Sequence, residues 1–262
     1  MCRFLAYQGK PILLEQLVAE PCYSLIHQSL HATQAPNATN GDGFGLGWYG
    51  ERPYPGIYRE VRPAWSDENL RAICAQVRSR QFFAHVRAST GTSTSRSNCH
   101  PFGSGRFMFM HNGQIADWVR VRRAVENLIP DNVYGDRIGS TDSEAIFLAS
   151  FAHGLALDPV AAFRATLREV KQAMIHAGVS EPLRFTATLS DGETLWAFRW
   201  SCDEMPPSLY YRETGAGVIL VSEPIDDHPA GWQEIPRQGT LVVREGKVVD
   251  LTVERSGWRD AA

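Results

Sequence analysis

The order of the elements that the sequence predicts favours an α+β domain, with two largely antiparallel sheets and helices packed outside them. Three observations lead to this fold class. Strand-like segments dominate the start of the chain, helical patterns follow one another in its middle, and the last third returns to strands. A doubly wound sheet would instead alternate strands and helices regularly along the chain.

The first part of the chain contains strands and one early helix. Aromatic, β-branched or alternating residues predict strands at 3–7, 41–49, 56–61, 81–87 and 106–110. Glycine alternates with larger residues from Gly41 to Gly47, which is typical of a strand that another backbone approaches closely. The polar residues 66–69 are typical of a helix start, and the apolar residues that follow them share one helical face.

The middle and the last third complete the pattern. Helical periodicity covers residues 115–128, 142–156 and 159–177. Strands at 183–189 and 195–200 flank the turn residues 190–193, which predicts a hairpin. Further strands are predicted at 208–212, 217–221, 241–244 and 248–253, and the last two of these pair across Glu245-Gly246.

Composition narrows the class of protein. The chain has 262 residues, is 44% hydrophobic and carries a net charge of −3, so no basic field indicates nucleic acid. We expect no membrane span and no secretory signal, because neither kind of apolar segment occurs. The five cysteines are scattered and form no C-x-x-C pair, which favours a reducing cytoplasm over a disulfide framework or a zinc module.

Cys2 is the first candidate for chemistry. Met1 is expected to be removed before so small a side chain, which leaves a thiol and a free α-amine on one residue. The α-amine has a pKa of about 7.7–8.0, so it can accept the thiol proton near neutral pH. Taken alone, a cysteine at this position is more often incidental than catalytic.

Three later segments also have a functional interpretation beside an ordinary one. Arg87 ends a strand and can grip a carboxylate with two N–H groups, with Thr90 nearby, or it is an exposed strand-end arginine. Asn112 and Gly113 can form an oxyanion hole, or they are a simple Asn-Gly turn. Asp142 can pair with a substrate ammonium, while Thr141 and Glu144 around it have the spacing of a capping box.

Two other patterns do not support a cofactor or a metal. The glycines from Gly41 to Gly47 do not match the dinucleotide fingerprint. Cys99, His100 and His111 lack a fourth ligand at a supporting spacing. His85 is expected to be a hydrogen-bonded strand residue, not a catalytic base.

The motifs taken together are more specific for a protein family than any one of them. N-terminal Met-Cys-Arg, D-G-x-G-x-G, H-x-R-x-S-T, H-N-G and S-T-D-S-E follow one another in this order, and this set resembles the class II glutamine amidotransferases. The resemblance covers residues 2–150 by motif. It implies the four-layer αββα sandwich of the N-terminal nucleophile hydrolases, formed by one domain over residues 1–262, and no cofactor.

The resemblance also implies a role for each candidate residue. Cys2 is implied as nucleophile and base, and Asn112 and Gly113 as the oxyanion hole. Arg87, with Thr90 nearby, is implied to bind the α-carboxylate of a glutaminyl group, and Asp142 its α-ammonium. The chemistry implied is attack on a γ-carboxamide, a γ-glutamyl thioester, loss of the amine, and hydrolysis.

Residues 1–5, 63–70 and 222–229 resemble a subgroup that includes the ergothioneine-pathway amidohydrolase, which removes a γ-glutamyl group from a sulfoxide-linked histidine betaine conjugate. The leading expectation is a free-standing hydrolase of a γ-glutamyl amide, either glutamine or a γ-glutamyl conjugate. The alternatives are a glutaminase subunit that supplies ammonia to a separate synthase, and a non-catalytic glutamine sensor. A bile-acid or penicillin amidase is disfavoured, because Arg87 and Asp142 suit an amino-acid head group. A homodimer is compatible with the sequence.

Overall fold

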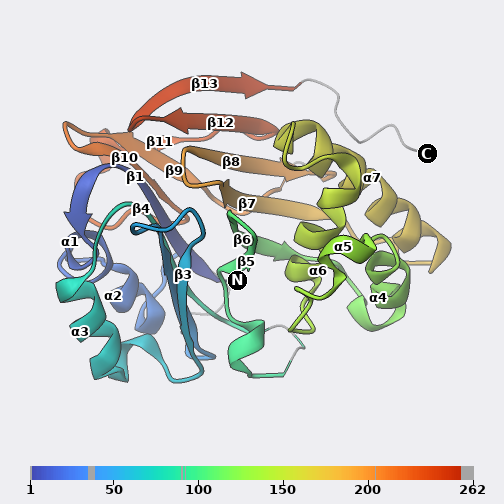
Figure 1. Cartoon of the computed structure of the whole chain (residues 1–262), viewed down its shortest axis with the longest axis horizontal. Helices are drawn as coiled ribbons and strands as arrows, with labels where there is room; N and C mark the ends of the chain where they lie inside the picture. Colours follow the sequence, from blue (N-terminus) through green and yellow to red (C-terminus); the bar gives the residue numbers. More distant parts are fainter. Residues whose placement is uncertain (1, 35–38, 90, 92, 204, 255–262) are drawn as a thin grey trace.

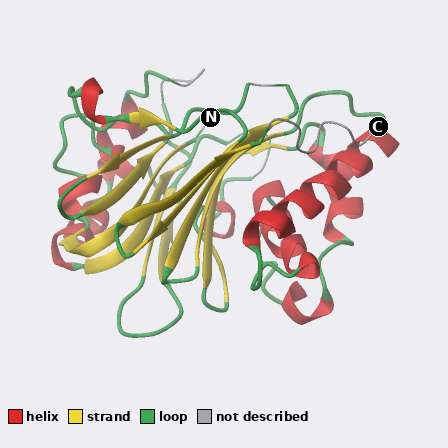
Figure 2. Cartoon of the chain, turned by 90° about the horizontal axis from the view of Figure 1, so that it is seen from above, coloured by secondary structure: helices red, strands yellow, loops and turns green. Residues whose placement is uncertain are grey.

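Two antiparallel sheets lie face to face, with helices on both outer faces (Figures 1 and 2). The computed structural model describes residues 2–34, 39–89, 91, 93–203 and 205–254. The predicted α+β fold class and its four αββα layers are confirmed, because separate apolar clusters lie between the sheets and beneath each helical layer.

The first sheet has seven strands and carries the start of the chain at its centre. Its order is β11 (Gln233–Glu234), β9 (Tyr210–Glu213), β10 (Gly217–Val221), β1 (Arg3–Leu13), β4 (Arg78–Val86), β2 (Phe44–Trp48) and β3 (Gly56–Glu60). Its outer face is covered by α1 (Glu15–Val18), α2 (Leu25–Leu30) and α3 (Glu68–Gln76), which follows the short η1 (Ala64–Ser66). The three helices bury the aliphatic side chains of β1 and β4 on that face.

The second sheet has six strands and lies beneath the larger helical layer. Its order is β13 (Lys247–Val253), β12 (Gly239–Arg244), β8 (Thr194–Ser201), β7 (Arg184–Ser190), β6 (Phe107–Gln114) and β5 (Phe102–Ser104). Outside it lie α4 (Trp118–Glu126), α5 (Asp131–Tyr134), α6 (Asp142–Ala149) and α7 (Pro159–His176). Stacked and tilted phenylalanines from β6, α6, α7 and β7 join this sheet to its helices.

The alternating glycines of β2 face the second sheet. A Cβ atom at Gly45 would lie 2.1 Å from His100 O, and one at Gly47 would lie 2.2 Å from Met108 Sδ. Backbone and side chains of residues 100–108 therefore occupy the space that larger residues would need. The close approach predicted from the glycine pattern is confirmed.

Several predicted boundaries were wrong. Strand β6 continues to Gln114, so Asn112 and Gly113 pair with Thr186 and Phe185 of β7 and do not form a turn. The helix predicted at 142–156 ends at Ala149 and continues as the 3-10 helix η3 (Ser150–His153), which Gly154 ends with a positive φ of 78°. Helices α1, α2 and α5 are single turns or little more, too short to show a clear period.

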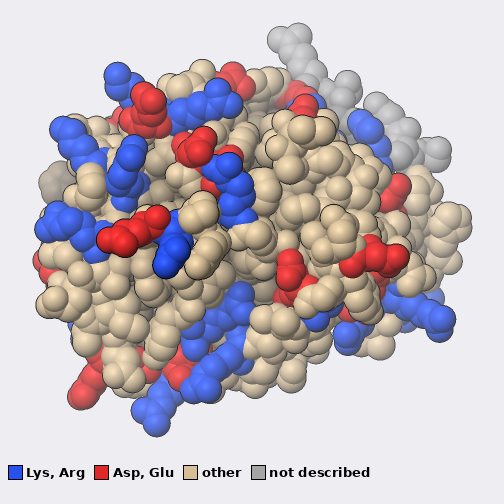
Figure 3. All heavy atoms as spheres, in the orientation of Figure 1, with Lys and Arg blue, Asp and Glu red and all other residues tan. Residues whose placement is uncertain are grey.

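The surface and the helices agree with the balanced composition. Lys and Arg side chains are interspersed with Asp and Glu on the face that Figure 3 shows. In the part of the chain that the structure describes, none of the helices is both long enough and apolar enough to cross a bilayer.

Candidate active site

Cys2 lies where the two sheets meet at one end of the sandwich. It directly precedes β1, and its Sγ lies 3.4 Å from Ala88 N and 3.5 Å from Ala88 O, just beyond the end of β4. From the second sheet, Asn112 Nδ2 on β6 donates to Cys2 O at 3.1 Å. The structure therefore brings the predicted nucleophile and one predicted oxyanion donor into direct contact.

The surroundings of the thiol act on its pKa in opposite directions. Burial raises the pKa of the Cys2 thiol, while the hydrogen bond from Ala88 and the positive charges of Arg87 and Arg3 lower it, with burial the larger effect. A thiol with a raised pKa stays protonated at neutral pH, so its attack on a substrate needs a base that removes the proton.

Arg87 lies next to Cys2 and is buried, with 3% of its surface exposed. Its guanidinium donates to Asp42 O at 3.4 Å, to Ser89 Oγ at 3.2 Å and to Ser93 O at 3.3 Å. The alternative of an exposed strand-end arginine is therefore wrong. Thr90, predicted beside it, lies outside the described residues.

Gly113 can only be glycine in this arrangement. A Cβ atom there would lie 2.2 Å from Arg184 O and 2.4 Å from His111 Nε2. Contacts this short do not occur between real Cβ atoms and backbone, so any side chain would push β6 away from β7. The turn that sequence statistics favour is replaced by a strand end paired with β7.

Asp142 opens α6, and both of its carboxylate oxygens already accept hydrogen bonds. Oδ2 accepts from Ile115 N at 2.6 Å, and Oδ1 accepts from Ser143 N at 2.8 Å. The contact with Ile115 places Asp142 beside the end of β6, the strand that carries Asn112 and Gly113. These two backbone donors fix the direction of the carboxylate. The role of Asp142 in binding a substrate ammonium stays a prediction.

The predicted capping box forms only in part. Thr141 is the N-cap, and its Oγ1 accepts from Glu144 N at 3.2 Å. The Glu144 carboxylate does not return to Thr141. It accepts instead from Ile138 N and Gly139 N and pairs with Arg137. A buried guanidinium competes for the carboxylate more strongly than a helix-end amide does.

The rings of His85 and His100 lie against each other at an angle of 32°, with centroids 4.3 Å apart. Burial lowers the pKa of His85 to about 3 and the pKa of His100 well below its ordinary value. No ring nitrogen of either has a hydrogen-bond partner among the described residues, so the expectation that His85 is hydrogen-bonded was wrong. The described residues include no group of His, Cys, Asp or Glu arranged to hold a metal ion.

Asp42 is a residue of this site that the sequence did not single out. Its Oδ2 accepts from Ser89 N at 2.7 Å, and its own N–H donates to Arg87 O at 3.0 Å. It therefore supports the turn that follows β4 and carries Arg87. Its position at the head of the glycine-alternating strand was the available signal, but the contact depends on the pairing of β2 with β4.

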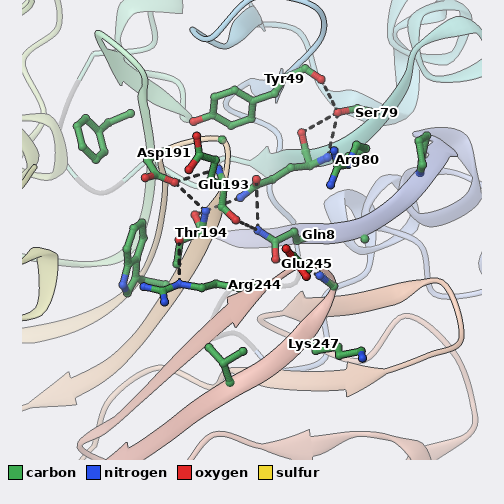
Figure 4. A pocket seen from close by; sticks show the side chains of 18 of the residues that line it. Gln8, Tyr49, Ser79, Arg80, Asp191, Glu193, Thr194, Arg244, Glu245 and Lys247 are labelled. Carbon is green, nitrogen blue, oxygen red and sulfur yellow. Dashed lines mark hydrogen bonds between the residues drawn. The ribbon is translucent and has the colours of Figure 1, made fainter.

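A cavity of about 1210 Å³ lies at the opposite end of the sandwich (Figure 4). It is lined by Gln8 near the far end of β1, Ser79 and Gln81 near the start of β4, and the turns at 191–193 and 244–247. The Gln8 side chain donates to Glu193 O at 2.9 Å and accepts from Gly246 N at 3.3 Å. Its lining contains none of the candidate site residues, so the cavity is separate from the Cys2 site.

Comparison with known proteins identifies the family. The model of the family described as glutamine amidotransferases class-II matches residues 1–209 of the chain. The chain belongs to this family. A probable glutamine amidotransferase of Saccharomyces cerevisiae, DUG3, is 30% identical over 298 residues, covering 95% of this chain and 83% of the relative. The family and the enzyme class predicted from the motifs, a class II glutamine amidotransferase-like hydrolase, are confirmed.

Two further relatives match over nearly their whole length. The gamma-glutamyl-hercynylcysteine sulfoxide hydrolase of Mycolicibacterium smegmatis is 30% identical and covers 95% of this chain and 98% of its own. A solved glutamine aminotransferase class-II domain protein from Silicibacter pomeroyi has a TM-score of 0.76 and 34% identity, covering 96% of this chain and 99% of its own. The similarity therefore includes the β-rich last third.

Proposed function

We propose that this class II glutamine amidotransferase-like enzyme hydrolyses a small γ-glutamyl amide through a thioester at Cys2. The observation that carries the proposal is the position of Cys2, held between Ala88 of the first sheet and Asn112 of the second. The similarity to the Mycolicibacterium smegmatis hydrolase supports a γ-glutamyl conjugate as substrate. We assign residues 1–262 to one domain.

The first half-reaction forms the thioester. After Met1 is removed, the Cys2 α-amine takes the thiol proton, and the thiolate attacks the γ-carbonyl carbon. The Asn112 amide and the Gly113 N–H stabilise the resulting oxyanion. The ammonium returns its proton to the leaving nitrogen, the C–N bond breaks, and the amine departs.

The second half-reaction releases glutamate. The same α-amine takes a proton from water, which attacks the thioester carbon, and the C–S bond breaks to regenerate the thiol. In this scheme Arg87, with Thr90, binds the α-carboxylate and Asp142 binds the α-ammonium of the substrate. Neither half-reaction needs a cofactor, a separate synthase or a second copy of the chain.

We place the enzyme in the cytoplasm. Cys2, Cys22, Cys74, Cys99 and Cys202 are all free thiols. Free thiols, one of them a nucleophile, are preserved in a reducing compartment and lost to oxidation outside it. This supports the compartment that the cysteine pattern favoured.

The decisive experiment is intact mass spectrometry before and after treatment with 6-diazo-5-oxo-norleucine, a glutamine-shaped electrophile that loses N₂ on alkylation. We expect protein without Met1 and a single adduct on Cys2. Cys2→Ala should give no adduct and no glutamate release. Cys202→Ala removes another half-buried cysteine and should label normally. Processed, folded protein that gives no adduct, or an adduct elsewhere, would refute the nucleophile assignment.

A further inference from the structure

A buried carboxylate outside the predicted catalytic set lies close to the nucleophile. Glu223 follows β10 and is 5% exposed. Its two oxygens accept from Thr33 N at 3.0 Å, from Gln34 N at 3.0 Å and from Thr33 Oγ1 at 2.6 Å. It belongs to the segment 222–229, which the sequence singled out and the reaction scheme leaves unused.

Glu223 also faces the residue that follows the nucleophile. The side chain of Arg3 is 1% exposed, and its Nη1 lies 3.6 Å from Glu223 Oε2. The same guanidinium donates to Ser222 O at 3.4 Å and to Gln34 O at 3.3 Å. A buried guanidinium is costly unless its charge is paired, and Arg3 Nε has no hydrogen-bond partner among the described residues. Glu223 supplies the charge for Arg3.

The start of β1 is bonded to the same segment through its backbone. Phe4 N donates to Ser222 Oγ at 2.9 Å, and Ser222 N donates to Phe4 O at 3.1 Å. Residues 3–4, 33–34 and 222–223 thus form one bonded unit, which we call the Glu223 cluster. Cys2 directly precedes Arg3 in the chain, so it enters the space between the sheets from this cluster.

We propose that Glu223 is a positioning residue for Cys2. It fixes the Arg3 guanidinium and the Thr33–Gln34 backbone, and through them it holds the Cys2 thiol against Ala88 and the Cys2 carbonyl oxygen against Asn112. Catalysis requires the reacting atoms to be placed within a fraction of an ångström, and a misplacement of about 1 Å can lower the rate roughly a hundredfold. The inference rests on the proposed function, because it names a residue that supports its nucleophile.

A purely structural role makes a different prediction. A carboxylate that only stabilises the fold would, when replaced, lower the unfolding free energy and leave kcat of the folded enzyme unchanged. A positioning residue lowers kcat in protein that is still folded. Substrate affinity is affected less, because Arg87 and Asp142 keep their own partners.

The test is Glu223→Gln in the full chain, which keeps the size of the side chain and removes its charge. We expect kcat for a γ-glutamyl amide to fall about tenfold or more with a smaller change in KM, and Cys2 labelling by 6-diazo-5-oxo-norleucine to slow in parallel. Thr33→Val removes only the hydroxyl contact at 2.6 Å and should act in the same direction with a smaller effect.

Asp226→Asn is the matched control. The Asp226 carboxylate also bonds an arginine, Arg212, and accepts from Trp232 Nε1 at 3.1 Å. Among the described residues, it has no hydrogen bond to Cys2 or to the Glu223 cluster. This variant should lower the thermal midpoint while kcat stays at the wild-type value. Equal losses of kcat in Glu223→Gln and Asp226→Asn would overturn the proposal.

A structural measurement separates this proposal from the proposed function. In a crystal structure of Glu223→Gln, we expect the contacts of Cys2 with Ala88 and Asn112 to be displaced. If they are unchanged and kcat is wild-type, Glu223 does not position Cys2. If the processed wild-type protein neither labels nor turns over, the proposed function fails, and the displacement of Cys2 still decides the role of Glu223. Should Glu223→Gln not fold, Thr33→Val gives the same readouts.

Discussion

At the scale of single residues, the site is defined by contacts between side chains far apart in sequence. The motifs named Cys2, Arg87, Asn112, Gly113 and Asp142, and the described structure places them around the ends of β1, β4 and β6. The sequence did not reveal the contacts of Asp42 and Glu223, because each accepts hydrogen bonds from backbone amides whose positions depend on the fold.

Arg87→Lys tests the proposed carboxylate clamp. Lysine keeps the charge but cannot offer two parallel N–H groups to a carboxylate, so we expect KM for a γ-glutamyl substrate to rise about tenfold or more with a smaller change in kcat. Steady-state kinetics of glutamate release measure both constants. Arg212→Lys, a strand arginine paired with Asp226, is the control. A KM equal to that of the wild type would remove Arg87 from the substrate site.

At the scale of elements, strand pairing overrode local preference. Asn-Gly usually forms a turn, yet residues 112 and 113 continue β6 because β7 supplies partners for both. The long helices and most strands were predictable from period alone. The one-turn helices and the η3 ending of α6 were not, because fewer than two turns carry no period.

Gly45→Ala tests the close packing of β2 against the second sheet. The new Cβ would meet backbone, His100 O at 2.1 Å, which cannot rotate away as a side chain can. We expect the free energy of unfolding to fall by about 1–3 kcal/mol. Urea denaturation measures it. Gly50→Ala, where a Cβ meets nothing within 4 Å, should change little, and equal losses in the two variants would argue against the packing explanation.

At the scale of the whole molecule, the packed layers bury three histidines and favour their neutral form. Burial lowers the pKa of His85 to about 3, and it lowers the pKa of His100 and of His111 as well. The unfolded chain binds protons at these residues below pH 6.5, whereas the folded chain binds them only at lower pH. Stability is therefore greatest above pH 6.5 and is lost as the pH falls from there toward the folded-state values.

The pH dependence of the free energy of unfolding tests whether these histidines are neutral in the folded chain. Between pH 6.5 and 5, each such histidine should contribute a slope of up to about 1.4 kcal/mol per pH unit, with stability rising as pH rises. His85→Leu should remove the contribution of one histidine to this slope, whatever its effect on the absolute free energy of unfolding. Urea titrations at several pH values measure the slope. A slope unchanged by the substitution would mean that His85 is protonated in the folded state.

The order of strands in the first sheet determines when the sheet can form during synthesis of the chain. Strand β1 pairs with β4 on one side and with β10 on the other, so Leu5 lies opposite Val221. A ribosome makes β1 long before β10, and Asn112 and Glu223 are also made later than Cys2. The first sheet cannot close until the last third of the chain has emerged. During that interval the strands that enclose Cys2 are not all present, so under the proposed mechanism an aminopeptidase can free the Cys2 α-amine before its pocket exists.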